Sequence, residues 1–379
     1  MKTFVTLIAL LLPMHGWAAK IPDPPQIDAK SYVLMDAATG DILAQHNADL
    51  RVEPASITKV LLSYVVYDEY RKGHASPDDE VLISEKAWRQ GKDSSESRMF
   101  LDVGSRVRLG DLMNGIVIQS GNDASVAVAE HLAGSEAAFA ELMNQYAVGL
   151  GMKNSNFTNA PGMPHPEHYT TAHDVALMGR ALIRDFPEDY KTYSVRDWTY
   201  NGIKQGNRNI LLDMDPGADG IKTGHTRAAG YCLLSSIKRD DRRLIAAVMG
   251  AKSTRARARY SLALMNWGFR FFDTANLLGP EKPIATQRIY KGLETQLPIG
   301  TLQQIALTLP RGAKDNLKIS QQINTPIVAP INKGQAVGKV RVSLDGKVLR
   351  EENLVALQDV PAGGLTQKIS DQIRMWIDQ

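Results

Sequence analysis

Apolar residues recur at intervals of three and four through the first two thirds of the chain, which predicts a series of amphipathic helices. The first begins at Ser56 and ends near Gly73, and its apolar face carries Ile57, Val60, Leu61, Tyr64 and Val65. Pro54 suits a helix entrance better than a helix interior. The same spacing predicts further helices over residues 109–119 and 124–132, from Ser135 to Gly149 or Gly151, from Thr170 or Thr171 to 184, and over 254–272.

Shorter β-prone runs lie on both sides of these helices. Residues 31–36 and 41–46 are predicted to form a hairpin, and later strands are predicted at 198–200, 220–223, 230–237 and 244–249. Because strands stand at both ends with helices between them, we expect one sheet whose first strands come from the N-terminus. The fold class is therefore mixed α/β, of the α+β kind.

After Gly279 the pattern changes to short strands separated by turns that contain Gly, Pro and Asn. The runs are 283–290, 304–309, 337–343 and 347–349, and Asp345-Gly346 is the clearest hairpin turn, since both residues tolerate positive φ. We expect a small all-β domain over residues 280–362. An amphipathic helix is expected over residues 363–379, with an apolar stripe of Leu365, Ile369, Ile373 and Trp376.

The first 18 residues are predicted to be a secretory signal peptide. Lys2 precedes a short apolar run, and small residues follow, with cleavage expected after Ala18 or, alternatively, after Ala19. An uncleaved anchor is the other interpretation, but the run is too short to span a bilayer comfortably. The first domain of the exported chain would then cover residues 19–279.

Composition narrows the class of protein. With 379 residues, 44% hydrophobic and 22% charged, the chain has the composition of a globular protein of about two domains. The formal net charge of +3 and the absence of a basic run with aromatic residues give no reason to expect nucleic-acid binding. Cys232 is the only cysteine, so no internal disulfide can form.

Ser56 and Lys59 form a Ser-x-x-Lys motif at a predicted helix start. Positions three apart share a helix face, so the serine hydroxyl would lie beside the amine, as a nucleophile and its base require. Roughly one or two such matches arise by chance in a chain of this length. A second one, Ser235 to Lys238, falls in a predicted strand, where residues three apart point to opposite faces.

Two further motifs each occur once: Ser120-Gly121-Asn122 between two predicted helices, and Lys222-Thr223-Gly224 on a predicted strand. Their order and settings after Ser56 resemble those of penicillin-recognising serine acyl transferases. The chain is more closely similar to the low-molecular-mass penicillin-binding proteins that act as D-Ala-D-Ala carboxypeptidases. The supporting stretches are 120–124, 206–209, 219–226 and 267–272; the resemblance covers about residues 28–275 and continues more weakly to the end.

The resemblance implies a DD-peptidase/β-lactamase-like transpeptidase domain and a role for each motif residue. Ser56 would be the nucleophile, Lys59 its base with a pKa lowered by burial and by Lys222, and Ser120 a proton carrier. The backbone N–H groups of Ser56 and His225 would stabilise the oxyanion. The residues implied to bind the substrate backbone and its carboxylate are Asn122, Lys222, Thr223, Gly224, His225, Arg208 and Arg257.

Alternative interpretations stay open for several residues. Asn122 is alternatively a plain helix cap, Arg208 and Arg257 are alternatively surface charges, and His225 alternatively acts through its imidazole. His165, His168 and His173 lack metal-ligand spacing, so we expect neither a metal nor a cofactor.

The resemblance implies a penicillin-sensitive enzyme that removes the terminal D-Ala from peptidoglycan stem pentapeptides. Its location would be the periplasm, with the C-terminal helix on the outer face of the cytoplasmic membrane. That helix alternatively packs on its own β domain or on a partner. A DD-endopeptidase, a β-lactamase and a non-catalytic wall-binding protein are the rival functions, and a serine-rich loop at 91–97 is a candidate cover for the site.

Overall fold

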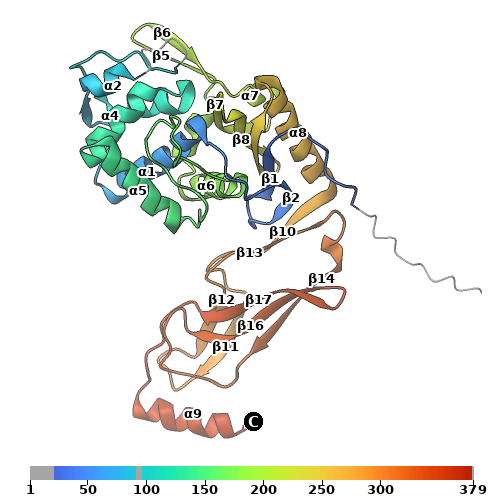
Figure 1. Cartoon of the computed structure of the whole chain (residues 1–379). Helices are drawn as coiled ribbons and strands as arrows, with labels where there is room; N and C mark the ends of the chain where they lie inside the picture. Colours follow the sequence, from blue (N-terminus) through green and yellow to red (C-terminus); the bar gives the residue numbers. More distant parts are fainter. Residues whose placement is uncertain (1–20, 91–95, 378–379) are drawn as a thin grey trace, which may run out of the picture.

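The structure is a computed structural model that describes residues 21–90 and 96–377. The predicted signal peptide and most of the predicted loop 91–97 lie outside the described residues. Figure 1 shows a large body of helices and strands above an elongated β body. The chain passes from the first body to the second at strand β10 (Phe272–Leu278), and helix α9 (Leu365–Ile377) lies at the far end of the second.

A five-stranded antiparallel sheet forms the centre of the large body, in the order β2-β1-β9-β8-β7. The prediction that N-terminal strands complete this sheet is confirmed, since β1 pairs with β9 across more than two hundred residues of sequence. The strands are β1 Ser31–Asp36, β2 Ile42–His46, β7 Ala218–Thr226, β8 Gly230–Arg239 and β9 Arg242–Ala251. Strand β7 is one edge of the sheet.

Both faces of the sheet are covered. Val33 and Ile245 belong to the core shared with the helical cluster, whereas Leu34 and Val248 point to the opposite face and pack with helix α8 (Thr254–Phe271). This two-sided burial explains why the inner strands β1 and β9 carry nearly continuous apolar runs rather than alternating ones.

The helical cluster lies on one side of the sheet (Figure 1). Ser135 and Thr171 cap two of its helices as expected, each accepting a hydrogen bond from the backbone N–H three residues later. The helices of this cluster are α1 Thr58–Lys72, α2 Glu85–Arg89, α3 Leu109–Asn114, α4 Asn122–Ala133, α5 Glu136–Gly149 and α6 Ala172–Asp185. Helix α7 (Leu211–Met214) packs with α8 on the other face of the sheet. Short strands complete the body: β3 Glu80–Leu82, β4 Arg106–Arg108, β5 Asp197–Tyr200 and β6 Ile203–Gly206.

The helix expected over residues 109–119 changes geometry halfway. After α3 the chain continues as a π-helical segment, Gly115–Gln119, and then enters the left-handed region at Ser120, with φ 72°. A Cβ on Gly115 would lie 2.4 Å from Met99 Sδ, so a larger residue there would require the Met99 side chain to move. Functional sites frequently use such π segments, and this one delivers Ser120 to the cleft described below.

The second body has a core of its own. A six-stranded sheet runs in the order β14-β16-β17-β12-β11-β15, and β10 pairs separately with β13. The turn predicted at Asp345-Gly346 is confirmed, with positive φ at both residues. The strands are β11 Ala285–Tyr290, β12 Gln296–Gly300, β13 Ile305–Pro310, β14 Leu317–Ile323, β15 Ile327–Val328, β16 Ala336–Leu344 and β17 Lys347–Ala356.

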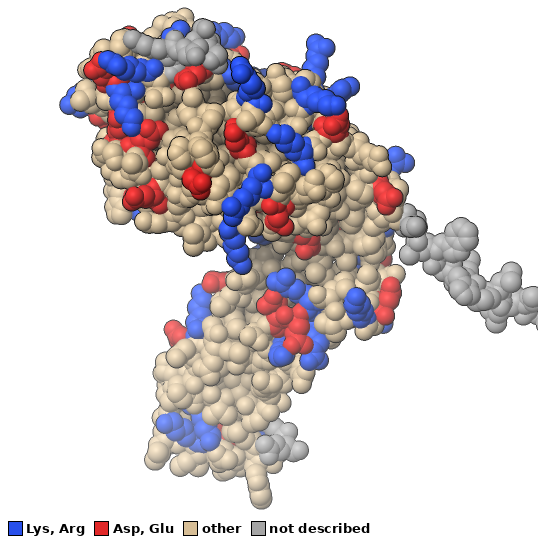
Figure 2. Space-filling view, viewed as in Figure 1, with Lys and Arg blue, Asp and Glu red and all other residues tan. Residues whose placement is uncertain are grey.

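Helix α9 contacts the β body through its polar side. The buried carboxylate of Asp371 accepts a 2.6 Å hydrogen bond from the backbone N–H of Lys291, whereas Leu365 and Trp376 are 78% and 85% exposed. Of the helices that the structure describes, none is long and apolar enough to cross a membrane. On the face of the whole molecule that Figure 2 draws, the acidic and basic side chains of the described residues are interspersed and form no broad field of one sign.

Candidate active site

A cleft of about 680 Å³ opens where β7, the start of α1 and the start of α4 meet. It brings together the three motifs that the sequence places far apart. Its lining includes every predicted site residue except the buried Lys59 and Lys222, which lie next to it: Ser56, Ser120, Asn122, Arg208, Thr223, Gly224, His225 and Arg257.

Ser56 lies in a 3-10 turn, Ala55–Ile57, and not in the first turn of the α-helix as expected; α1 begins at Thr58. In a 3-10 turn residues three apart are eclipsed, so the predicted Ser-Lys approach is preserved. The Lys59 amine lies 3.1 Å from Ser56 Oγ.

Lys59 is fully buried and has two fixed acceptors besides Ser56. Its Nζ donates to Asn122 Oδ1 at 2.8 Å and to the Pro161 carbonyl at 2.6 Å. A neutral amine has two N–H bonds and one lone pair. When Lys59 is neutral, both N–H bonds are therefore satisfied by these acceptors, and the lone pair is left to face the Ser56 hydroxyl.

The pKa of Lys59 is lowered to about 7. Burial is the main cause, and the positive charge of Arg208 adds to it, while Asp123 and Glu96 act in the opposite direction. We expected Lys222 to be the neighbouring cation, but Arg208 is the one that lowers this pKa. Burial, with the charges of Lys59 and both cleft arginines, holds the pKa of Lys222 well below its usual range as well. A lysine with a pKa near 7 can serve as a base at neutral pH.

Ser120 and Asn122 reach the cleft from the π segment and the start of α4. The Ser120 hydroxyl is buried and has no hydrogen-bond partner among the described residues. Asn122 is not a plain helix cap, because Gly121 occupies that position and the Asn122 oxygen accepts from Lys59. Its Nδ2 donates to Glu96 Oε2 at 3.3 Å.

Lys222, Thr223 and Gly224 lie on β7, at the open edge of the sheet. A Cβ on Gly224 would lie 2.8 Å from the Pro54 carbonyl oxygen. The resemblance implied that Gly224 binds the substrate; its close neighbour in the structure is the protein's own turn that carries Ser56. The glycine thus sets the distance between β7 and the nucleophile.

The two candidate carboxylate-binding arginines occupy different environments. Arg257 is buried, its Nη1 donates to the Gly224 and Cys232 carbonyls, and burial lowers its pKa to about 10. A surface charge is therefore excluded for Arg257. Arg208 is solvent-exposed but lines the cleft.

Several residues at the site carried no signal in the sequence. The Pro161 carbonyl holds Lys59, and the Asp123 carboxylate accepts the backbone N–H groups of Met99, Phe100 and Leu101. Behind α1, buried His168 lies 2.9 Å from Thr58 Oγ1 and anchors the first turn. Every residue has a backbone carbonyl, so the role of Pro161 could not be predicted from its residue type. Asp123 directly follows the Ser120-Gly121-Asn122 motif, but the sequence does not indicate which N–H groups its carboxylate accepts.

Comparisons with known proteins agree with this geometry. Residues 18–253 match the Peptidase S11 family model, described as D-alanyl-D-alanine carboxypeptidase, and residues 272–362 match the model described as penicillin-binding protein 5, C-terminal domain. The chain is 44% identical over 359 residues to D-alanyl-D-alanine carboxypeptidase DacA of Escherichia coli (strain K12), covering 94% of this chain and 89% of that one.

Solved structures agree over both bodies. Penicillin binding protein 5 from Haemophilus influenzae superimposes with a TM-score of 0.82 at 42% identity, covering 90% of this chain and 99% of that chain. The D-alanyl-D-alanine carboxypeptidase DacD from Francisella tularensis gives a TM-score of 0.70 at 33% identity, covering 90% and 96%. The similarity thus extends from the cleft to the C-terminal β body.

Proposed function

The chain belongs to the family of serine-type D-alanyl-D-alanine carboxypeptidases, and we propose that it removes the terminal D-alanine from peptidoglycan stem pentapeptides through an acyl intermediate on Ser56. The observation that carries this proposal is the hydrogen-bond set of Lys59. Two acceptors hold its N–H bonds and turn its lone pair toward the Ser56 hydroxyl.

In the first step Lys59 takes the Ser56 proton, and Ser56 Oγ bonds to the carbonyl carbon of the penultimate D-alanine. The C–N bond to the last D-alanine then breaks, and the leaving amine receives the proton held by Lys59 through Ser120, whose buried hydroxyl lines this cleft and has no hydrogen-bond partner in the part of the chain that the structure describes. Water attacks the ester in the second step and frees Ser56. The backbone N–H groups of Ser56 and His225 hold the negative oxygen of each tetrahedral intermediate.

The substrate pairs with the edge strand β7 as an added strand, with its C-terminus toward Lys222. Asn122 bonds its peptide backbone. Lys222, Thr223, Arg257 and Arg208 provide the positive and polar groups for the terminal carboxylate.

We also propose where the cleft is located in the cell. We propose a signal peptide over 1–18, a catalytic domain over 19–279 and a β domain over 280–362. The helix over 363–379 rests on the outer face of the cytoplasmic membrane, in the periplasm. The exposed apolar stripe of α9, turned away from its Asp371 anchor, supports this placement.

One comparison of substrates tests the activity. The purified protein should release D-alanine from a stem pentapeptide much faster than it cleaves a cross-linked dimer or turns over a penicillin. Faster cleavage of the dimer would assign an endopeptidase, rapid penicillin turnover a β-lactamase, and no reaction a binding protein.

A further inference from the structure

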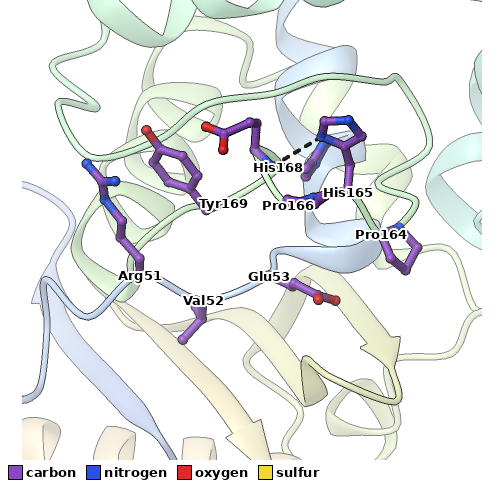
Figure 3. A pocket seen from close by; sticks show the side chains of 9 residues that line it. Arg51, Val52, Glu53, Pro164, His165, Pro166, His168 and Tyr169 are labelled. Atoms are coloured by element: carbon purple, nitrogen blue, oxygen red, sulfur yellow. Dashed lines mark hydrogen bonds between the residues drawn. The ribbon is translucent and has the colours of Figure 1, made fainter.

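A second hollow, of about 540 Å³, lies beside the catalytic cleft. Figure 3 shows it between two segments, 51–53 and 164–169. The segments are tied together at one end, because Val52 and Thr170 exchange two backbone hydrogen bonds of 2.9 Å. The hollow is therefore held open by the fold.

The hollow continues the cleft at the far end of β7. Pro164 lines both spaces, and Thr226, the last residue of β7 and a lining residue of the cleft, donates a 2.8 Å hydrogen bond to Glu53 Oε2 inside the hollow. A peptide paired antiparallel with β7, with its C-terminus toward Lys222, runs toward Thr226 in its upstream part. The proposed mechanism puts the carbonyl of the penultimate D-alanine at the backbone N–H of His225. Strands advance about 3.3 Å per residue, so the residue before D-Ala-D-Ala, one step further upstream, lies beside Thr226 and its partner Glu53.

The hollow holds carboxylates without cationic partners. Among the described residues, no Lys or Arg lies within ion-pair distance of Glu53 or Glu167. Arg51 is stacked on Tyr169, with its guanidinium carbon 4.3 Å from the ring centre. In Figure 3 Arg51 and Tyr169 lie on one side, whereas Glu53 extends toward Pro164 and so toward the cleft.

From these observations we infer that the hollow is a subsite for the residue immediately upstream of D-Ala-D-Ala, and that it selects a side chain ending in a free amine, which pairs with Glu53. The inference rests on the proposed carboxypeptidase function and adds a preference to it. The Thr226 hydrogen bond holds Glu53 Oε2, which leaves Oε1 for the incoming ammonium.

Two peptides of equal length test this subsite: acetyl-L-Lys-D-Ala-D-Ala with a free ε-amine, and the same peptide with that amine acetylated. The measured quantity is the ratio of their kcat/KM values for D-alanine release. We expect the wild-type protein to favour the free amine about two- to fivefold at low salt, as for a partly exposed ion pair, and less at high salt.

Glu53→Gln keeps an acceptor for Thr226 and removes the charge, so its ratio should fall to about one. Glu53→Lys should bring the ratio below one. The control is Glu294→Gln, which removes an exposed carboxylate from the β body and should keep the wild-type ratio.

The outcomes separate the two proposals. If neither peptide is cleaved, the proposed function is wrong. If both are cleaved and the wild-type ratio is near one, or if Glu53→Gln keeps the wild-type preference, the subsite is wrong and the carboxypeptidase activity stands.

Discussion

Lys59 Nζ donates a 2.8 Å hydrogen bond to Asn122 Oδ1 across 63 residues of sequence. This contact joins the first two motifs and restricts the amine to one orientation. Together with the Pro161 carbonyl it decides where the lone pair of a neutral Lys59 points. The base is thus oriented by groups on two other segments, and not by its helix alone.

Lys59→Arg should abolish acylation while preserving the fold. Arginine is never deprotonated at working pH, so it cannot take the Ser56 proton. We expect the second-order rate of acylation by penicillin to fall by about 10³ or more, measured with a fluorescent penicillin. Lys191→Arg, at an exposed site remote from the cleft, is the control and should leave the rate unchanged. A Lys59→Arg variant that acylates at near wild-type rate would remove Lys59 from its role as base.

The acylation rate should depend on pH through Lys59. Since burial lowers the pKa of this lysine to about 7 and only the neutral amine is a base, the rate should rise with pH and level off above that value. Well below it, each pH unit should cost about tenfold. Stopped-flow acylation between about pH 5 and pH 9, with circular dichroism to verify folding, measures this dependence. A flat profile over that range would contradict a lysine base.

Gly224→Ala should displace the strand that faces the nucleophile. The added Cβ would lie 2.8 Å from the Pro54 carbonyl oxygen, so either β7 or the Ser56 turn must move. We expect a stability loss of about 1–3 kcal/mol and a larger loss of acylation rate. Gly149→Ala is the matched control, because nothing lies within 4 Å of the Cβ it adds at the end of α5. Urea unfolding and penicillin acylation report the two effects; wild-type acylation by Gly224→Ala would contradict the close fit.

The exposed stripe of α9 should control binding to a membrane surface. Ile373→Glu places a charge on the apolar side of the helix, and we expect it to reduce sedimentation with phosphatidylethanolamine–phosphatidylglycerol vesicles by about tenfold or more. Gln372→Glu adds the same charge beside Lys291, on the side that faces the β body, and should bind nearly as the wild type does. Equal binding by both variants would indicate that the stripe packs elsewhere.

The sequence carried enough information to locate the three motifs, because their chemistry resides in side chains at short, ordered spacings. It also indicated the sheet, since β1 and β9 are apolar runs that need partners. It did not indicate the π segment before Ser120, because Leu109, Leu112 and Ile116 have the spacing of an ordinary α-helix. Met99 packs closely on Gly115 at the start of that segment, a contact between separate parts of the chain that local spacing does not indicate.

The hydrogen bonds that orient Lys59 could not be predicted from the sequence, for a related reason. The Pro161 carbonyl belongs to a loop whose composition predicts only a turn, and its contact with Lys59 spans 102 residues. The hydrogen bond from Thr226 to Glu53 joins residues that are still further apart, 173 positions in the sequence, and involves residue types that are common on any surface. Such contacts arise from tertiary structure, not from local pattern.

The central claim is that Ser56 is the acylated residue. Incubation with penicillin, tryptic digestion and mass mapping test it most directly, because cleavage after Arg51 and Lys59 isolates Ser56 in the peptide of residues 52–59. We predict one covalent penicillin on that peptide, absent from Ser56→Ala. An adduct that persists in Ser56→Ala, or that maps to another peptide, would contradict the account.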